Sequence, residues 1–187
     1  MPAITTTYKP NDRAAWRSWL QAHHAVAEEI WLLLDDVSGA QTLSYLDAVE
    51  EAICFGWIDS IQKRFSPTER AQRFSPRRRR SKWSELNKER ARRLIRLGLM
   101  HAAGRATLPD LDAPFVIADD IVAAIKADPD AWRYFSAFPD LYVRVHIGNI
   151  EGLRRSPEDF ARRLAKFIQK TAAGTLFGDW NDGGRLG

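Results

Sequence analysis

The chain contains a single cysteine in 187 residues, and this scarcity is the first of several informative absences. One cysteine, Cys54, excludes an intramolecular disulfide, and its apolar neighbours Ile53 and Phe55 favour a buried thiol. No apolar run approaches the roughly 20 residues that span a membrane, and the N-terminal residues lack the hydrophobic segment of a signal peptide. We therefore expect a cytoplasmic protein without a membrane span.

Motifs for catalysis and cofactor binding are also missing. The sequence has no phosphate-binding glycine loop, no dinucleotide fingerprint, no Gly-x-Ser-x-Gly, and no Cys-x-x-Cys or His-Glu-x-x-His. The four histidines, His23, His24, His101 and His146, have no partner at a metal-ligand spacing. We expect no metal and no cofactor, and the sequence leaves enzymatic activity open while favouring a protein that is not an enzyme.

Positive charge, in contrast, is abundant and concentrated in one segment. Residues 62–105 contain fifteen Lys or Arg and three acids, so they carry +12 while the rest of the chain carries −8. The net charge of +4 conceals this asymmetry. A segment of this kind is typical of a surface that binds anions, nucleic acid included, although a solvated charged face is the simpler interpretation.

Hydrophobic periodicity predicts an α+β fold. Apolar residues at helical spacing predict helices at 13–24, after Asp12, and at 45–55, after Ser44. The short apolar run at 30–34 is typical of a buried strand. From residue 57 the period changes to two, and residues 57–75 predict a β-hairpin. These elements indicate a small mixed or antiparallel sheet packed against helices.

Helices are predicted for most of the remaining chain. A basic helix begins after Ser81 or Ser84 and runs to Leu97. Further helix caps are predicted at three positions, Asp119, Asp128 and Ser156. The pattern at residues 141–153 fits either a helix or a strand.

The chain is expected to have three parts, divided where proline, glycine and a change of charge sign coincide. Residues 1–108 form the α+β core, and residues 109–174 form a helical part packed on the same core. Residues 175–187 form a glycine-rich tail that is mobile apart from anchoring by Phe177 or Trp180.

Asp59 is the most informative single residue of the hairpin. The two-residue period places it with Trp57 and Ile61 on the inward face, where an ionised carboxylate needs a partner. Pairing with a residue such as Arg73 would make Asp59 part of a structural ion pair, which is the favoured interpretation. The alternative is a carboxylate at the floor of a cleft rimmed by Trp57 and Trp83, which binds a cationic group or acts as an acid or base.

Three segments, residues 44–60, 73–77 and 81–95, resemble the YdeI/OmpD-associated family, also called bacteriocin-protection proteins. The similarity covers about residues 31–104 and weakens beyond, because residues 157–164 lack a Thr-Arg pair of the family pattern. The resemblance implies a bacterial cytoplasmic α+β protein associated with tolerance of bacteriocins or cationic antimicrobial peptides. It implies no known reaction and no catalytic residue.

Motif position and side-chain chemistry define two sets of candidate residues. The candidate ligand-binding residues are Trp57, Asp59, Arg73, Ser75, Arg77, Trp83, Asn87 and Arg90. The candidate anion-binding surface consists of Arg78, Arg79, Arg80, Lys82, Lys88, Arg92, Arg93 and Arg96.

The predicted function is that of a non-enzymatic stress or resistance protein, which binds a small anionic ligand or a protein partner through a basic, Trp-lined surface. Two alternatives stay open. One is weak, sequence-independent nucleic-acid binding through the basic segment, and the other is an enzyme that uses Asp59. The oligomeric state is not predicted.

Overall fold

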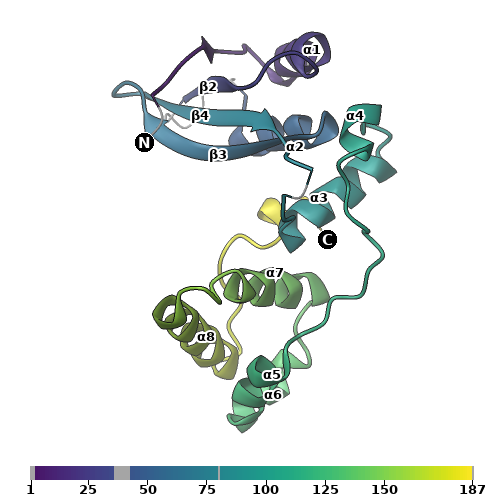
Figure 1. The fold of residues 1–187 in the computed structure, drawn as a ribbon. Coiled ribbons are helices and arrows are strands. Elements are labelled where there is room, and N and C mark those ends of the chain that lie inside the picture. Colours follow the sequence, from purple (N-terminus) through teal and green to yellow (C-terminus); the bar gives the residue numbers. More distant parts are fainter. Residues whose placement is uncertain (1–2, 36–42, 80, 187) are drawn as a thin grey trace. The chain divides into compact units, whose positions relative to one another are not determined.

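The computed structural model describes residues 3–35, 43–79 and 81–186. The chain divides into two compact units, each described here by itself (Figure 1). The first, which we name the sheet unit, comprises Met1–Lys82 and Arg90–Pro109. The second, the helical unit, comprises Trp83–Glu89 and Asp110–Gly187.

The sheet unit contains a mixed four-stranded sheet with the strand order β1-β2-β4-β3. The strands are β1 (Thr7–Tyr8), β2 (Ile30–Asp35), β3 (Trp57–Arg64) and β4 (Glu69–Pro76). β1 is parallel to β2, and the other neighbours are antiparallel. The structure confirms the predicted α+β class, the buried strand and the hairpin, and it adds the short β1, which the sequence pattern did not indicate.

The helices of the sheet unit are α1 (Arg13–His23), α2 (Tyr45–Cys54), α4 (Ala102–Arg105) and the part of α3 (Glu85–Arg96) that belongs to this unit. Two of them, α1 and α2, begin after the caps predicted for them. Asp12 accepts a hydrogen bond from the Ala15 amide at 2.7 Å, and Ser44 accepts one from the Asp47 amide at 3.1 Å. Both side chains satisfy amides that the helix itself leaves open.

Two glycines allow α4 to approach the end of α2. Gly56 follows α2 with a φ of +75°, as its position after the helix predicts, and a Cβ there would lie 2.9 Å from the Ala103 carbonyl oxygen. A Cβ on Gly104 would lie 2.2 Å from the Cys54 carbonyl oxygen. Only residues without a Cβ fit this close backbone contact.

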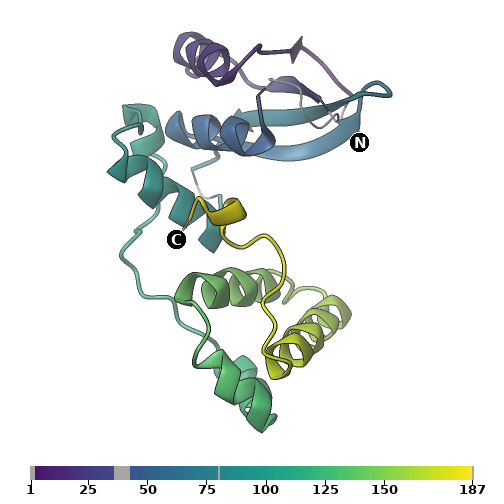
Figure 2. The ribbon, with the colours of Figure 1, turned by 180° about the vertical axis from the view of Figure 1, so that it is seen from behind.

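Tryptophans fill the core of the sheet unit. Trp16, Trp31 and Trp57 are almost completely buried, together with Phe74. The Trp16 indole N–H donates to the Ala48 carbonyl at 3.0 Å, so its polar atom is satisfied. The Trp16 ring lies 5.6 Å from the Phe74 ring, and this contact joins α1 to the sheet. Helix α2 lies along β3 (Figure 2).

A buried ion-pair network connects three helices of the sheet unit. Glu50 and Glu51 of α2 have 0% and 2% of their surface exposed. The guanidinium groups of Arg13 and Arg17 each lie 2.6 Å from Glu51, and that of Arg93 lies 2.6 Å from Glu50. Because a buried carboxylate is costly without a partner, these contacts fix α1 and α3 against α2.

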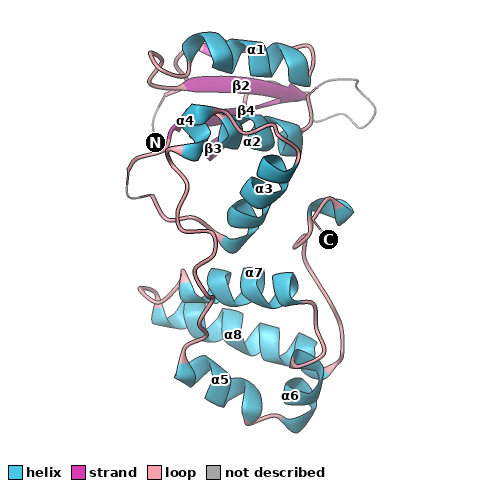
Figure 3. Cartoon of the chain, turned by 90° about the vertical axis from the view of Figure 1, so that its right-hand side faces the viewer, coloured by secondary structure: helices cyan, strands magenta, loops and turns pink. Residues whose placement is uncertain are grey.

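The helical unit has a hydrophobic core of its own. Its helices are α5 (Asp119–Lys126), α6 (Pro129–Phe135), α7 (Asp140–Glu151), α8 (Pro157–Ala172), the first part of α3, and the 3-10 turn η1 (Asp182–Gly184) (Figure 3). Ile121, Ile125, Tyr142, Ile147 and Phe167 are fully buried in this core. The segment at 141–153, whose pattern fits either a helix or a strand, lies almost entirely within α7 and is helical there.

Cap predictions in the helical unit have mixed outcomes. Asp128 accepts hydrogen bonds from two amides at the start of α6, which confirms it as a cap. The prediction for Asp119 is wrong, because Ala118 occupies the cap position and Asp119 is the first residue of the helix. Ser156 stands at the cap position of α8 but donates its hydroxyl to the Asp159 carboxylate.

In the tail, Phe177 and Trp180 pack against the helical core. Both rings meet Tyr142 edge-on, with centroid distances of 6.1 Å and 5.7 Å. His146 Nε2 lies 3.0 Å from the Phe177 carbonyl oxygen. Among the described residues, no helix combines the length and the apolar composition needed to cross a membrane.

Candidate functional site

A β-bulge interrupts the hairpin beside Asp59. Asp59 lies opposite Phe74, whereas the next paired residue of β3, Gln62, lies opposite Gln72. Two residues of β3 therefore face one residue of β4 between these pairs. The additional residue shifts the alternation of side chains by one position.

This shift corrects the predicted faces of β3. An uninterrupted period of two would place Lys63 on the face of Asp59. Lys63 instead pairs with Ala71 on the opposite face, and its ammonium lies 5.7 Å from the centre of the Trp31 ring. Gln62 joins Asp59, so a carboxylate and an amide share one face of the hairpin.

A polar hollow of about 310 Å³ lies on this face. We name it the sheet hollow; it is lined by Tyr45, Asp59, Ser60, Gln62, Arg70 and Gln72. These residues come from β3, β4 and the first position of α2. Only Asp59 belongs to the predicted ligand-binding set. The others were missed because the bulge and the packing of α2 decide which side chains line the hollow.

Two groups of the sheet unit act on Asp59, one through a hydrogen bond and one through its charge. The Tyr45 hydroxyl donates to Asp59 Oδ2 at 2.7 Å. Arg77 is 7% exposed, and its burial lowers the pKa of its guanidinium to about 10. The negative charge of Asp59 partly opposes this shift, because it favours the charged form of Arg77. The Arg77 amide donates to the Gly56 carbonyl at 2.9 Å, which fixes the chain where it leaves β4. The structure thus brings together two predicted site residues, Asp59 and Arg77.

Arg73 is not the counter-ion of Asp59. Its guanidinium lies 2.5 Å from Glu29 and donates more weakly to the Ser60 hydroxyl at 3.4 Å. Hydrogen bonds from Thr5 and then from Arg73 lower the pKa of Glu29. The proposed Asp59–Arg73 pair is therefore not formed: Arg73 pairs with Glu29, and the guanidinium whose pKa the Asp59 charge affects is that of Arg77.

The remaining predicted ligand-binding residues do not line the sheet hollow. Trp57 is 1% exposed, and its indole N–H donates to the His24 carbonyl at 3.2 Å, so it is a core residue rather than the rim of a cleft. Ser75 pairs with Ile58, one position out of phase with Asp59, which places it on the other face. Two further candidates, Trp83 and Asn87, belong to the helical unit, and Arg90 is 7% exposed.

Intramolecular ion pairs occupy part of the predicted anion-binding surface. Lys88 lies 2.6 Å from Glu85, and Arg93 contacts Glu50 in the buried network. Arg92 is half-buried, and Arg80 lies outside the described residues. The exposed members of the set are Arg78, Arg79, Lys82 and Arg96.

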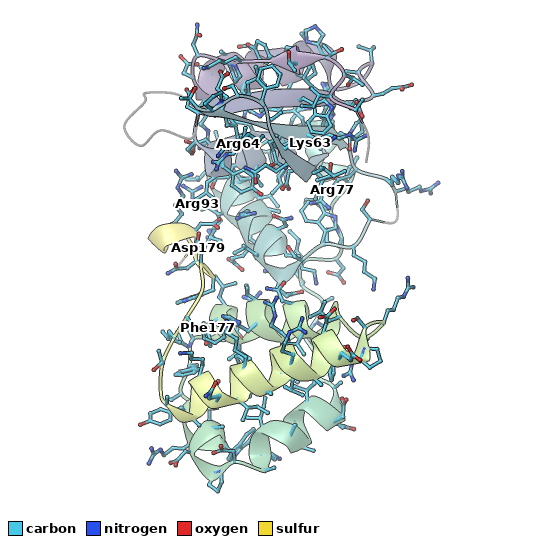
Figure 4. The ribbon with its side chains drawn as sticks, turned by 90° about the vertical axis from the view of Figure 1, so that its left-hand side faces the viewer. Lys63, Arg64, Arg77, Arg93, Phe177 and Asp179 are labelled. Atoms are coloured by element: carbon cyan, nitrogen blue, oxygen red, sulfur yellow. The ribbon has the colours of Figure 1, made fainter. Side chains whose placement is uncertain are left out.

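Cations gather instead at the far end of the hairpin. A second shallow hollow of about 240 Å³ adjoins the first and is lined by Gln62, Lys63, Arg64 and Arg70. Figure 4 shows Lys63 and Arg64 on β3 and Arg77 near the end of the hairpin that leads into α3. We name Lys63, Arg64 and Arg70 the hairpin cations. Arg64 is exposed and donates to the Pro67 carbonyl at 3.1 Å.

Other reactive groups of the described residues lie away from the hollow. The Cys54 thiol is buried, and burial raises its pKa to about 11, so it is protonated at neutral pH. No three His, Cys, Asp or Glu side chains in the described part of the chain gather closely enough to hold a metal ion.

Fold and site together define an α+β unit with a cation-flanked polar hollow, followed in the sequence by a helical unit. Residues 8–107 match the family model described as a domain of unknown function (DUF8412), and since this match covers more than half of the chain, the protein belongs to that family. Residues 114–174 match the model described as "Bacteriocin-protection, YdeI or OmpD-Associated". Comparisons with curated proteins and with solved structures found no match.

A segment similar to the expected family is therefore found, but in another part of the chain. The segments on which the resemblance was based, within residues 44–95, fall in the domain of unknown function. The bacteriocin-protection match lies in the helical unit, beyond Gly104, where the resemblance was expected to weaken. This match suggests a role in bacteriocin protection or in a related stress response.

Proposed function

We propose that this protein acts in bacteriocin protection or in a related stress response, and that it does so by binding a ligand and not by catalysis. The proposed site is the sheet hollow with the hairpin cations, and the proposed ligand is a small molecule that carries an anionic group. The observation that carries this proposal is the composition of the hollow. Guanidinium and amide groups of Arg70, Gln62 and Gln72 surround a space of about 310 Å³, at the lower end of the range of about 300–1,000 Å³ for small-molecule sites.

The chemistry of the lining favours an anionic group. Two of the hairpin cations, Arg64 and Arg70, pair with each other across the strands on the face of Asp59, and the charge of Asp59 also acts on the buried Arg77. Arginine binds carboxylate and phosphate groups with paired hydrogen bonds, and amide N–H groups add directional donors. A ligand with a carboxylate or phosphate would therefore be bound by the Arg64 and Arg70 end of the site.

Arg64→Gln tests this proposal, because Arg64 is exposed and can be changed without opening the core. We expect inorganic phosphate, citrate or a mononucleotide to raise the melting temperature of the native protein. The variant should lose affinity by at least about tenfold, since a charge-assisted hydrogen bond contributes about 1.5–3 kcal/mol. Isothermal titration calorimetry measures the affinity.

Arg162→Gln is the matched control, since Arg162 is an exposed arginine of α8. This control should bind the anion as the native protein does. In a bacterial strain that depends on this protein, Arg64→Gln should also reduce survival during challenge with a cationic antimicrobial peptide. Equal affinities of the two variants, or no anion binding by the native protein, would overturn the proposal.

A further inference from the structure

The sheet hollow presents both signs of charge. Its lining includes a carboxylate, Asp59, and a guanidinium, Arg70, with the amides of Gln62 and Gln72 as further polar groups. A site that only binds anions gains nothing from a carboxylate in its lining, because that carboxylate repels the ligand. Asp59 also interacts with Tyr45 and Arg77, but as a carboxylate in the lining it favours a ligand that carries a positive group as well.

Asp59 is held in place to receive such a group. Tyr45 binds one carboxylate oxygen, Oδ2, at 2.7 Å, and the charge of Arg77 faces the same residue. Within the described part of the chain, no hydrogen bond involves the other oxygen, Oδ1. A fixed carboxylate binds an ammonium group at a lower entropic cost than a rotating one.

The strand register sets the distance between the two charges. Asp59 of β3 lies opposite Phe74 of β4, and Arg70 lies four residues before Phe74 on β4. Four residues of a strand span about 13 Å, which is the backbone distance along the strand between the levels of Asp59 and Arg70. Gln72 and its partner Gln62 lie midway. Both charged side chains line the hollow, and the two amide side chains line it at the register positions between them.

We infer that the ligand of the sheet hollow is a zwitterion of dipeptide size, whose ammonium group binds Asp59 and whose carboxylate binds Arg70. This inference rests on the proposed function and specifies its ligand class. An extended dipeptide spans at most about 7 Å. Its central peptide group would then meet Gln62 and Gln72, whose amides donate and accept hydrogen bonds.

Four small probes test the inference on the native, full-length protein. They are L-alanyl-L-alanine, its N-acetyl derivative, its C-terminal amide, and inorganic phosphate. The acetyl group removes the ammonium, and the amide removes the carboxylate. We expect the free dipeptide to bind at least tenfold more tightly than either derivative, measured by calorimetry or by NMR shifts of the Gln62 and Gln72 amides.

Asp59→Asn adds a second readout. In this variant the free dipeptide and its N-acetyl derivative should bind with equal affinity, because the group that distinguishes them is gone. The comparison of derivatives on the native protein remains valid even if this variant unfolds.

The outcomes separate the inference from the proposed function. If phosphate or the N-acetyl derivative binds as tightly as the dipeptide, the site accepts anions only; the inference is then wrong and the proposed function stands. If the dipeptide amide matches the dipeptide, the carboxylate contact is wrong. If none of the probes binds, both the proposed function and the inference fall.

Discussion

Asp59 has two interactions of different kinds, a hydrogen bond from the Tyr45 hydroxyl and a longer-range attraction to the charge of the buried Arg77. The hydrogen bond survives in any side chain with an accepting oxygen. The interaction between charges does not. Substitutions at Asp59 and at Tyr45 can therefore separate the two interactions.

We predict that Asp59→Asn destabilises the fold by about 1–3 kcal/mol, because the desolvated Arg77 guanidinium loses the negative charge that faces it. Tyr45→Phe retains that charge and should cost about 1 kcal/mol, the usual value of one hydrogen bond. Urea denaturation of the three proteins measures the difference. An unchanged unfolding free energy for Asp59→Asn would show that Arg77 does not depend on this carboxylate.

At the scale of single residues, the sequence predicts which side chains need an interaction partner better than it predicts which residue that partner is. It identified Asp59 as a carboxylate that needs a partner, but it proposed Arg73, which instead pairs with Glu29. Glu29 precedes β2, far from the hairpin in the sequence, and no local pattern connects them. Tyr45 is likewise brought to Asp59 only by the packing of α2 on the sheet.

At the scale of elements, the caps and the bulge show where sequence patterns succeed and fail. Ser44 and Asp12 act through residues within one helical turn, so their positions could be predicted. The bulge after Asp59 depends on the register of β3 against β4, which a single strand pattern does not contain. The missed lining residue Gln62 follows directly from that register.

The tail of the helical unit gives a prediction about pH. His146 Nε2 contacts the Phe177 carbonyl oxygen, and the His146 ring packs on Tyr142 and Phe167. Burial lowers the pKa of His146 below its ordinary value of 6.5; the hydrogen bond with the Phe177 carbonyl partly opposes this shift, and the charge of Arg163 adds to it. Its neutral form is therefore favoured in the folded state, so the stability it contributes is complete above pH 6.5 and is lost as the pH falls through the lowered pKa.

We expect the backbone amides of residues 175–181 to exchange hydrogen faster, relative to an unstructured peptide, as the pH falls below 6.5. Hydrogen-exchange mass spectrometry measures this change. In His146→Gln the pH dependence should be weaker, whereas His23→Gln, which changes an exposed histidine of α1, should retain it. Identical profiles for native protein and His146→Gln would exclude His146 as the titrating group.

At the scale of the whole molecule, charge distribution is more informative than net charge. The sequence of residues 62–105, with a net charge of +12, predicts a continuous cationic surface. In the structure, however, Arg73, Lys88 and Arg93 each form an ion pair with an acidic residue of their own unit. Sequence counts cannot reveal this neutralisation, because the acids come from outside the basic segment or from the same helix. The matches to two family models, at residues 8–107 and 114–174, likewise show two regions where the local resemblance suggested one.

Because of these ion pairs, we predict weak nucleic-acid binding that does not depend on base sequence. The exposed residues Arg78, Arg79, Lys82 and Arg96 can contact phosphates, and each neutralised phosphate releases bound counterions. Affinity for a fluorescein-labelled duplex or single-stranded RNA should therefore be measurable at about 50 mM salt and fall steeply by about 200 mM. Fluorescence anisotropy follows this titration, and a mixed-sequence and a homopolymeric RNA should give the same curve. Tight binding that persists at the higher salt concentration, or a preference for one RNA sequence, would favour nucleic-acid recognition over the small-ligand function. The absence of binding at the lower salt concentration would eliminate the nucleic-acid alternative.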